Sequence, residues 1–323
     1  MADTAHAGML PPAHIRRRRS SGSSRMRKYQ HLWFVLPGLV FFLAFMIYPA
    51  IFAVYVSMTG WTGLGNDFPF VGLDNFIQAL TTWPLYRAAI NNGIMFISIL
   101  IFQHTVGLFL AVQLNAKPRF MEFYRTVLFM PVIISLVATG FIWTLMLSPH
   151  IGFINPVLKD LGLGFLAKNW LSDPSFALGT VIFVQCWNSL GWSIIIYLSG
   201  LQSIPEELTQ AAQVDGASAW QTFWRVTFPL LSPAFTALTI LTFIGTFRAF
   251  DVVYVLTGPI GSPAYRTDIL GTLIYRTAFG GAGQSSADVR MSYGIAMSLI
   301  VFVVMAIVAW VLIKLLRRRE IDA

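Results

Sequence analysis

Long apolar runs separated by short polar segments make up most of the chain beyond about residue 33. A helix needs about 20 predominantly apolar residues to cross about 30 Å of hydrocarbon. Runs of roughly that length predict about six transmembrane helices, which makes the chain an all-α, polytopic membrane protein. The predicted spans cover residues 33–57, 90–114, 124–147, 176–200, 233–256 and 293–316.

The composition supports that pattern. Of the 323 residues, 56% are hydrophobic and only 11% are charged, whereas a soluble domain carries about 25% charged residues. One soluble core cannot hide so much apolar surface, so lipid must surround most of the chain. The single cysteine, Cys186, excludes a disulfide framework, a Cys-rich metal site and a CxxC redox pair.

The net charge is +8, and the positions of the charged residues along the chain indicate how it is oriented in the membrane. If the N-terminus is cytoplasmic, most of the 22 Lys and Arg residues fall on the cytoplasmic side of an even number of spans. This bias predicts that both termini and the segment 202–231 are cytoplasmic. Residues 1–30 are polar, basic and rich in Ser and Pro, which predicts a disordered tail near anionic lipid rather than a segment that binds nucleic acid.

The cytoplasmic segment before the fifth predicted span has strong signals for two short helices. Ser203 and Glu206 have the spacing of a capping box, which predicts the start of a first helix. Gly216 can adopt the left-handed conformation that ends it, and Ser218 with Gln221 repeats the capping-box spacing. A compact helix–Gly–helix unit of this kind suits a part that transmits force to a partner. An amphipathic hairpin on the membrane surface fits the same pattern equally well.

The residues of this unit resemble the EAA loop of bacterial ABC-importer permeases. The matching positions are Gln210-Ala211-Ala212, Gly216 and Phe228-Pro229-Leu230. The stretches FRAFDVVYVLTGP (247–259) and TDILGTLIYRTAFG (267–280) resemble the first permease of carbohydrate importers of the maltose and glycerol-3-phosphate type. The resemblance implies a type I permease fold over residues 31–323, with the loop at about 202–231 coupling to an ATPase. It also implies a multi-pass protein of the bacterial inner membrane.

The resemblance further implies partners and a docking surface. The partners are a second homologous permease, two ABC ATPase subunits that bind the ATP, and an extracytoplasmic solute-binding protein; the chain itself needs no cofactor. Gln210 stands where the family usually has Glu, so it keeps hydrogen bonding but loses the charge-assisted part. The expected ATPase-docking residues are Glu206, Glu207, Gln210, Ala211, Ala212, Asp215 and Gly216.

Polar side chains inside the fourth and fifth predicted spans indicate a solute pathway. Such residues are costly in lipid and usually face a cavity or a partner. Amide and hydroxyl groups beside an aromatic ring suit a sugar, and in the maltose importer the sugar contacts lie on these two spans. Hydrogen bonds between helices explain the same residues about as well. The candidate pathway residues are Gln185, Asn188, Ser189, Trp192, Thr242, Gly245 and Thr246.

Four other polar residues in or near the spans have structural interpretations. Arg248 and Asp251 are three positions apart, which favours an ion pair on one helix over a gate or a solute clamp. Asn91 and Asn92 are expected to begin the second span.

The sequence contains no catalytic or metal-binding set. It has no GxxxxGK[ST] phosphate-binding loop, and its five histidines are scattered without an HExxH pattern. The leading hypothesis is therefore a permease of an ATP-driven importer for a sugar, oligosaccharide or polyol. A secondary transporter driven by an ion gradient would need membrane-buried carboxylates and internal repeats, and a membrane enzyme would need a reactive constellation. The sequence does not decide between a sugar and a glycerol phosphate.

Overall fold

In the computed structural model, residues 34–281 and 289–318 are described, so the predicted tail at 1–30 lies outside them. The regular structure of this part is helical, apart from an isolated β-bridge between Thr59 and Phe70. The chain divides into two compact units, Met1–Phe52 and Ala53–Ala323. The described part of the first unit belongs to a 24-residue apolar helix, Phe34–Ser57, which includes the π-helical turn η1 (Leu43–Ile47) and α2 (Tyr48–Ser57).

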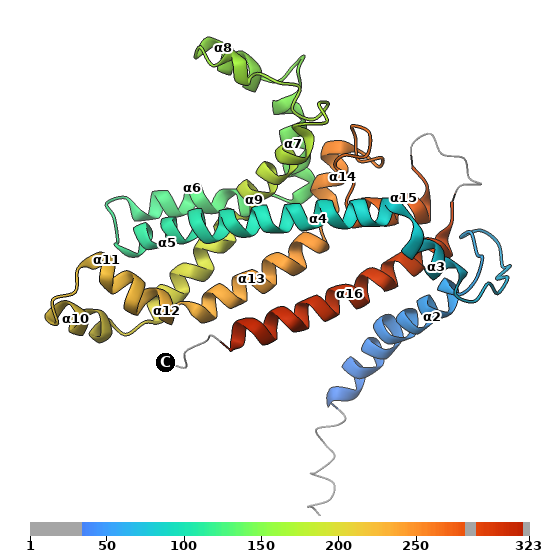
Figure 1. Cartoon of the computed structure of the whole chain (residues 1–323), viewed down its shortest axis with the longest axis horizontal. Coiled ribbons are helices and arrows are strands. Elements are labelled where there is room, and N and C mark those ends of the chain that lie inside the picture. Colours follow the sequence, from blue (N-terminus) through green and yellow to red (C-terminus); the bar gives the residue numbers. More distant parts are fainter. Residues whose placement is uncertain (1–33, 282–288, 319–323) are drawn as a thin grey trace, which may run out of the picture. The chain divides into compact units, whose positions relative to one another are not determined.

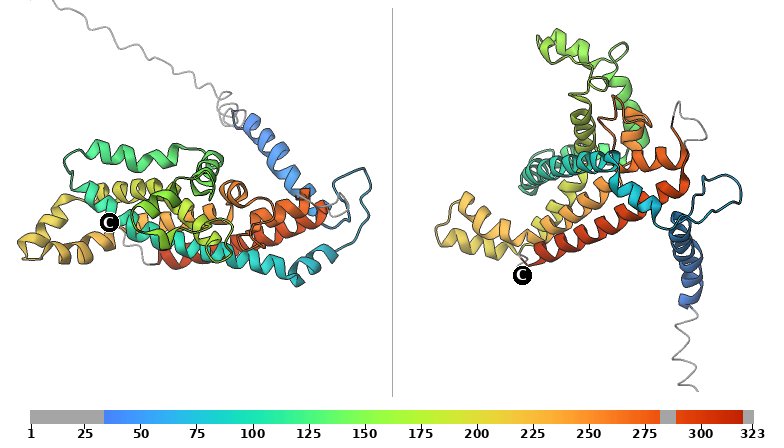
Figure 2. Two further views of the ribbon diagram at one scale, coloured as in Figure 1. Left: turned by 90° about the horizontal axis from the view of Figure 1, so that it is seen from above. Right: turned by 45° about the vertical axis from the view of Figure 1, so that its right-hand side comes forward.

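The second unit contains all the remaining helices, which Figures 1 and 2 show. They are α3 (Asp74–Thr81), α4 (Trp83–Phe102), η2 (Gln103–Gly107), α5 (Leu108–Asn115), α6 (Met121–Ile133), α7 (Leu136–Leu147), α8 (Ile154–Asp160), η3 (Gly164–Leu166), α9 (Ala177–Ser203), α10 (Glu206–Val214), α11 (Ala219–Thr222), η4 (Phe223–Thr227), α12 (Phe228–Leu230), α13 (Ser232–Phe247), α14 (Asp251–Thr257), α15 (Leu270–Phe279) and α16 (Met291–Arg317).

The prediction of about six spans is confirmed, with two changes of shape. Four helices are long and apolar enough to cross a membrane, and there are up to six spans if each of two bent helix pairs counts as one. The predicted span 124–147 is such a pair, because α6 and α7 meet at an angle of 99°. Ile134 and Ser135 leave the helical conformation there, and the Ser135 hydroxyl accepts a hydrogen bond from the backbone N–H of Ala138, which starts a new helix.

The predicted span 233–256 is also wrong as a single helix. Helix α13 ends at Phe247 and α14 begins at Asp251, and Phe250 between them has φ −147°, outside the helical range. Helix α14 instead packs against α7 and α9, where Val252 and Val253 are fully buried. Gly140 permits this close approach, because a Cβ there would lie 2.9 Å from the Cβ of Val255. Packing on α7 therefore decides where the fifth predicted span breaks.

Three apolar clusters hold the second unit together. One joins α4, α7, α9 and α14 around Met95 and Val184, and a second joins α5, α9 and α13 around Tyr197 and Leu238. The third joins α3, α4, α15 and α16. Helix α13 packs against both α4 and α16, and Figure 1 shows the three running side by side. The arrangement leaves one wall of α9 and α13 free to line a pocket.

Asn91 and Asn92 do not begin a helix, contrary to the prediction. Both lie within α4 and are buried. The Asn91 amide donates to the carbonyl oxygens of Arg266 and Asp268, at 3.0 and 2.7 Å. The Asn92 amide donates to the carbonyl oxygen of Thr246 and accepts from the backbone N–H of Leu270. The two side chains therefore bind α4 to the end of α13 and to the segment before α15.

Candidate functional site

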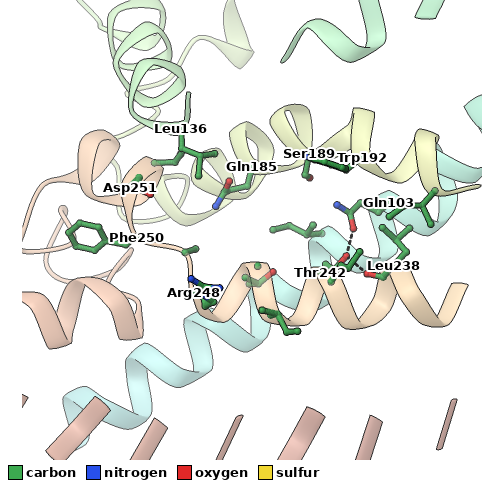
Figure 3. A pocket seen from close by; sticks show the side chains of 18 residues that line it. Gln103, Leu136, Gln185, Ser189, Trp192, Leu238, Thr242, Arg248, Phe250 and Asp251 are labelled. Atoms are coloured by element: carbon green, nitrogen blue, oxygen red, sulfur yellow. Dashed lines mark hydrogen bonds between the residues drawn. The ribbon is translucent and has the colours of Figure 1, made fainter. Parts of the chain in front are cut away.

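A pocket of about 540 Å³ lies between η2, α9, α13 and the start of α14. Figure 3 shows the side chains that line it. Its polar lining comes from amide, hydroxyl and charged groups, and its apolar lining from aliphatic and aromatic side chains. The polar members are Gln103, Gln185, Ser189, Thr242, Thr246, Arg248 and Asp251.

The structure brings the predicted pathway residues to this pocket, with the exception of Asn188. Trp192 is 57% exposed in the pocket wall, where its ring offers an apolar surface beside polar groups. Asn188 is buried elsewhere, and its amide donates to the carbonyl oxygen of Pro131 at 2.8 Å and to the Thr139 hydroxyl at 3.3 Å. These bonds tie α9 to the bend between α6 and α7, and Asn188 is not part of the pocket lining.

Gln103 lines the pocket although the sequence analysis did not place it there. It opens the π-helical turn η2, and its side-chain oxygen accepts a hydrogen bond from the Thr242 hydroxyl. A π-helical turn inserts an extra residue into a helix and redirects the side chains that follow. The available signal was the polar pair Gln103 and His104 inside an otherwise apolar run.

His104 points away from the pocket and joins three helices. Its Nε2 lies 3.0 Å from the Thr239 hydroxyl, and its Nδ1 bonds to the Tyr197 hydroxyl. Thr239 already donates its only hydroxyl proton to the carbonyl oxygen of Phe235, so Nε2 must be the donor to Thr239. Nδ1 then accepts the Tyr197 proton. A neutral imidazole satisfies every bond, and the arrangement fixes η2 against α9 and α13.

The predicted ion pair between Arg248 and Asp251 does not form. Both side chains are exposed and line the pocket from either side of the break between α13 and α14. Within residues 34–281 and 289–318, the ion pairs involve only Asp268. The two opposite charges are therefore separate groups in the pocket wall.

Asp268 carries a buried charge network that the sequence analysis missed. Its carboxylate is completely buried and accepts hydrogen bonds from both terminal nitrogens of Arg276, at 3.1 and 2.8 Å. Arg276 also donates to the carbonyl oxygen of Pro259, and the Thr272 hydroxyl donates to Asp268. The guanidinium group of Arg87 lies 4.0 Å from the same carboxylate. This paired carboxylate fixes the loop between α14 and α15.

The cytoplasmic unit predicted at 202–231 has its second capping box but not its first. Gly216 has φ +82°, and Ser218 and Gln221 exchange both capping hydrogen bonds, at 2.9 and 3.3 Å. Ser203 is instead the last residue of α9 and donates to the carbonyl oxygen of Gly200. Pro205 disfavours the helical conformation of the residue before it, so α10 starts after the proline.

The predicted docking residues lie together on α10 and the turn that follows it. All are exposed except Ala212, which is half-buried. A hollow of about 400 Å³ separates α10 from α11, and Thr222 faces it with a buried hydroxyl that has no hydrogen-bond partner. Helix α10 buries none of its own side chains. So exposed a helix is suited to docking on another protein.

Comparison with known proteins identifies the family. Residues 103–321 match the family described as binding-protein-dependent transport system inner membrane component. The chain belongs to this family of ABC-importer permeases. The permease is therefore a multi-pass membrane component of a transport system, in a family of transport proteins rather than enzymes.

The relatives of the permease include sugar transport proteins. It is 32% identical to the multiple sugar-binding transport system permease protein MsmF of Streptococcus mutans, over 92% of this chain and 98% of that protein. It is also 32% identical to the lactose transport system permease protein LacF of Rhizobium radiobacter, over 86% of this chain and 94% of that protein. Both alignments extend over nearly the full length of the relatives.

A solved structure has the same fold. The permease superimposes with a TM-score of 0.76 and 25% identity on a chain of a bacterial ABC transporter involved in the import of the acidic polysaccharide alginate. The match covers 91% of the permease and 97% of that chain. It confirms the predicted type I importer fold. The permease also matches, with a TM-score of 0.72 and 25% identity, a chain in the structure of a bacterial alginate ABC transporter in complex with an alginate pentasaccharide-bound periplasmic protein.

Proposed function

We propose that this permease forms half of the pathway of an ATP-driven importer for a carbohydrate, and that the pocket between α9 and α13 is part of that pathway. The observation that carries the proposal is the lining of the pocket, where the exposed Trp192 ring lies beside the polar Gln185 and Ser189. Sugars combine an apolar ring face with many hydroxyl groups, so they match a wall of this kind. The sugar transport relatives support the same solute class.

A second homologous permease completes the pathway in this proposal, and two ATPase subunits dock under the cytoplasmic loops. Glu206, Glu207 and Asp215 supply the negative charge that Gln210 lacks, because all three are exposed and have no ion-pair partner among the described residues. An extracytoplasmic solute-binding protein delivers the carbohydrate. Both termini are cytoplasmic, as the distribution of Lys and Arg favours.

Asp268 is not a candidate for the coupling carboxylate of an ion-driven secondary transporter. A coupling carboxylate must bind and release a cation during transport. Asp268 is fully buried and already bonded to Arg276 and Thr272, so it is not available for that exchange. Its bonds explain it as a structural group.

Reconstitution tests the proposal directly. The tagged permease is extracted gently, its bound partners are identified by mass spectrometry, and the whole complex is placed in proteoliposomes. We expect a second permease and an ATPase to remain bound in near-fixed ratio. We also expect ATP-dependent uptake of at least one member of a panel of maltose, lactose, xylose, alginate oligosaccharide and glycerol 3-phosphate. Isolation of the chain without an ATPase, or uptake driven by an ion gradient, contradicts the proposal.

Gly245→Leu is expected to reduce carbohydrate uptake about tenfold or more. Gly245 lines the pocket, and a Cβ added there meets nothing within 4 Å, so the larger side chain projects into the pocket without disturbing α13. Initial uptake rates in the reconstituted complex measure the effect. Gly179→Leu is the matched control, because that helical glycine also has open space around it but lies outside the pocket lining. Equal uptake by the two variants removes the pocket from the pathway.

A further inference from the structure

The pocket wall carries two opposite charges that have no ion-pair partner. Arg248 and Asp251 are both exposed and both line the pocket. The salt bridges in the described ranges, 34–281 and 289–318, all involve Asp268, so neither side chain is neutralised by the other or by a third residue. Figure 3 shows them at the same end of the pocket, to which Gln185 of α9 also contributes.

The fold holds these two side chains on the pocket side. Arg248 is the C-cap residue directly after α13, with its backbone N–H bonded to the carbonyl oxygen of Ile244 at 3.1 Å. Asp251 begins α14, whose following residues Val252 and Val253 are buried against α7 and α9. A straight helix would have placed the two residues one turn apart on a single face. Because of the break, Arg248 is held by α13 and Asp251 by α14.

Unpaired charges in the wall of a membrane protein are costly, and they usually mark a solute or ion pathway. A guanidinium group only donates hydrogen bonds, and a carboxylate only accepts them. A sugar hydroxyl does both, so neighbouring hydroxyls of one molecule can accept from Arg248 and donate to Asp251. An anionic solute would be attracted by the arginine but repelled by the aspartate. An uncharged polyhydroxy solute satisfies both groups.

We propose that Arg248 and Asp251 form a hydroxyl-binding pair that selects an uncharged carbohydrate at the break between α13 and α14. This inference rests on the proposed import function and adds the two residues that determine the charge of the solute. Gln185 contributes its amide from the opposite helix, and Trp192 provides the apolar surface. The preference for a neutral solute separates this permease from its structural relative in the import of acidic alginate.

The test uses the whole reconstituted complex with Arg248→Gln, Asp251→Asn and the double variant. The probe is whichever of maltose, lactose and xylose the wild type transports fastest, with alginate oligosaccharide as the acidic competitor. We expect each single variant to lose about tenfold or more of its neutral-sugar uptake, because each loses a charge-assisted hydrogen bond. The double variant should be at least as impaired as either single one. Retention of the ATPase should be unchanged in all three.

The second measurement is the ratio of alginate-oligosaccharide uptake to neutral-sugar uptake. A substitution that only disturbs the fold would lower both rates and leave this ratio unchanged. We expect Asp251→Asn to raise this ratio, because it removes the charge that repels an anion, and Arg248→Gln to lower it. Arg266→Gln and Asp160→Asn are matched controls, since both residues are exposed and lie outside the pocket lining. Neither control should change the ratio or the rate.

Several results would overturn the inference. Wild-type uptake by either single variant excludes a solute contact. Recovery of uptake in the double variant shows instead that the two residues pair with each other during transport. If the wild type transports only alginate oligosaccharide or only glycerol 3-phosphate, the neutral preference is wrong. Import of alginate oligosaccharide would leave the proposed carbohydrate function standing. If the wild type transports none of the sugars, the proposed function fails, and this inference fails with it.

Discussion

Gly216→Pro is expected to abolish uptake while leaving the permease inserted in the membrane. Gly216 has φ +82°, whereas the φ of proline is fixed near −65°. The backbone N–H of Gly216 also donates to the carbonyl oxygen of Gln213 at 3.0 Å, and proline has no such N–H. A proline in this turn has an incompatible φ and removes the N–H, so we expect the docking conformation to lose about 3 kcal/mol, which corresponds to about 100-fold in the docked population. Uptake and ATPase retention, measured at equal expression, should fall together.

The chain offers a close control for this substitution. Gly162 follows α8 as Gly216 follows α10, with φ +74° and a backbone N–H that bonds to the carbonyl oxygen of Lys159 at 3.0 Å. A Cβ at either glycine meets nothing within 4 Å. Gly162→Pro therefore imposes the same local strain on the side predicted to be extracytoplasmic, and the ATPase should remain bound. Gly216→Asn should retain most activity, because Asn tolerates the left-handed conformation. Loss of the ATPase in both proline variants would remove the docking role.

Asp268→Ala is expected to destabilise the permease by about 3–5 kcal/mol, the usual cost of removing one partner of a buried ion pair. Arg276 is 7% exposed and would keep its charge without a carboxylate nearby. The loop between α14 and α15 would also lose the group that Thr272 and Arg276 share. Thermal unfolding of the detergent-solubilised complex, followed by tryptophan fluorescence, measures the loss.

Replacing both Asp268 and Arg276 tests whether the two charges serve only to neutralise each other in the buried network. The double variant Asp268→Leu with Arg276→Leu removes both charges, so it should recover a large part of the lost stability. Asp160→Asn, at an exposed carboxylate of α8, should leave the unfolding temperature unchanged. A single Asp268→Ala variant as stable as the wild type would show that the network does not hold the loop.

The helix–Gly–helix unit at 202–231 illustrates which features local sequence determines. Gly216 and the Ser218–Gln221 capping box form as predicted, because their hydrogen bonds join residues three positions apart and need no other part of the fold. The same spacing at Ser203 and Glu206 was misleading. There α9 continues to Ser203, and Pro205 imposes the break just beyond it.

The pocket shows the limits of helical spacing. Helical spacing predicted that Asn188 lies beside Gln185 on one face of α9. In the structure the Asn188 amide instead donates to the carbonyl oxygen of Pro131, near the bend between α6 and α7. Pro131 and the N-cap residue Ser135 mark that bend in the sequence, but hydropathy alone reads the apolar run as one span. Gln103 lines the pocket from the first position of a π-helical turn, and hydropathy does not reveal such a turn.

The sequence by itself determined that this protein is a helical membrane protein with a left-handed turn at Gly216 and a capped helix after it, because hydropathy and short-range capping act within single segments. The resemblance to the EAA loop indicated the permease family. Only the tertiary structure decided which polar groups meet. The break between α13 and α14 depends on packing against α7, and it is this break that leaves Arg248 and Asp251 unpaired in the pocket wall. Asp268 is buried with Arg276 because α4 and α15 close around it. Burial and contacts between distant segments determine whether the charges are paired, both in the pocket wall and around Asp268. Local sequence spacing does not reveal these contacts.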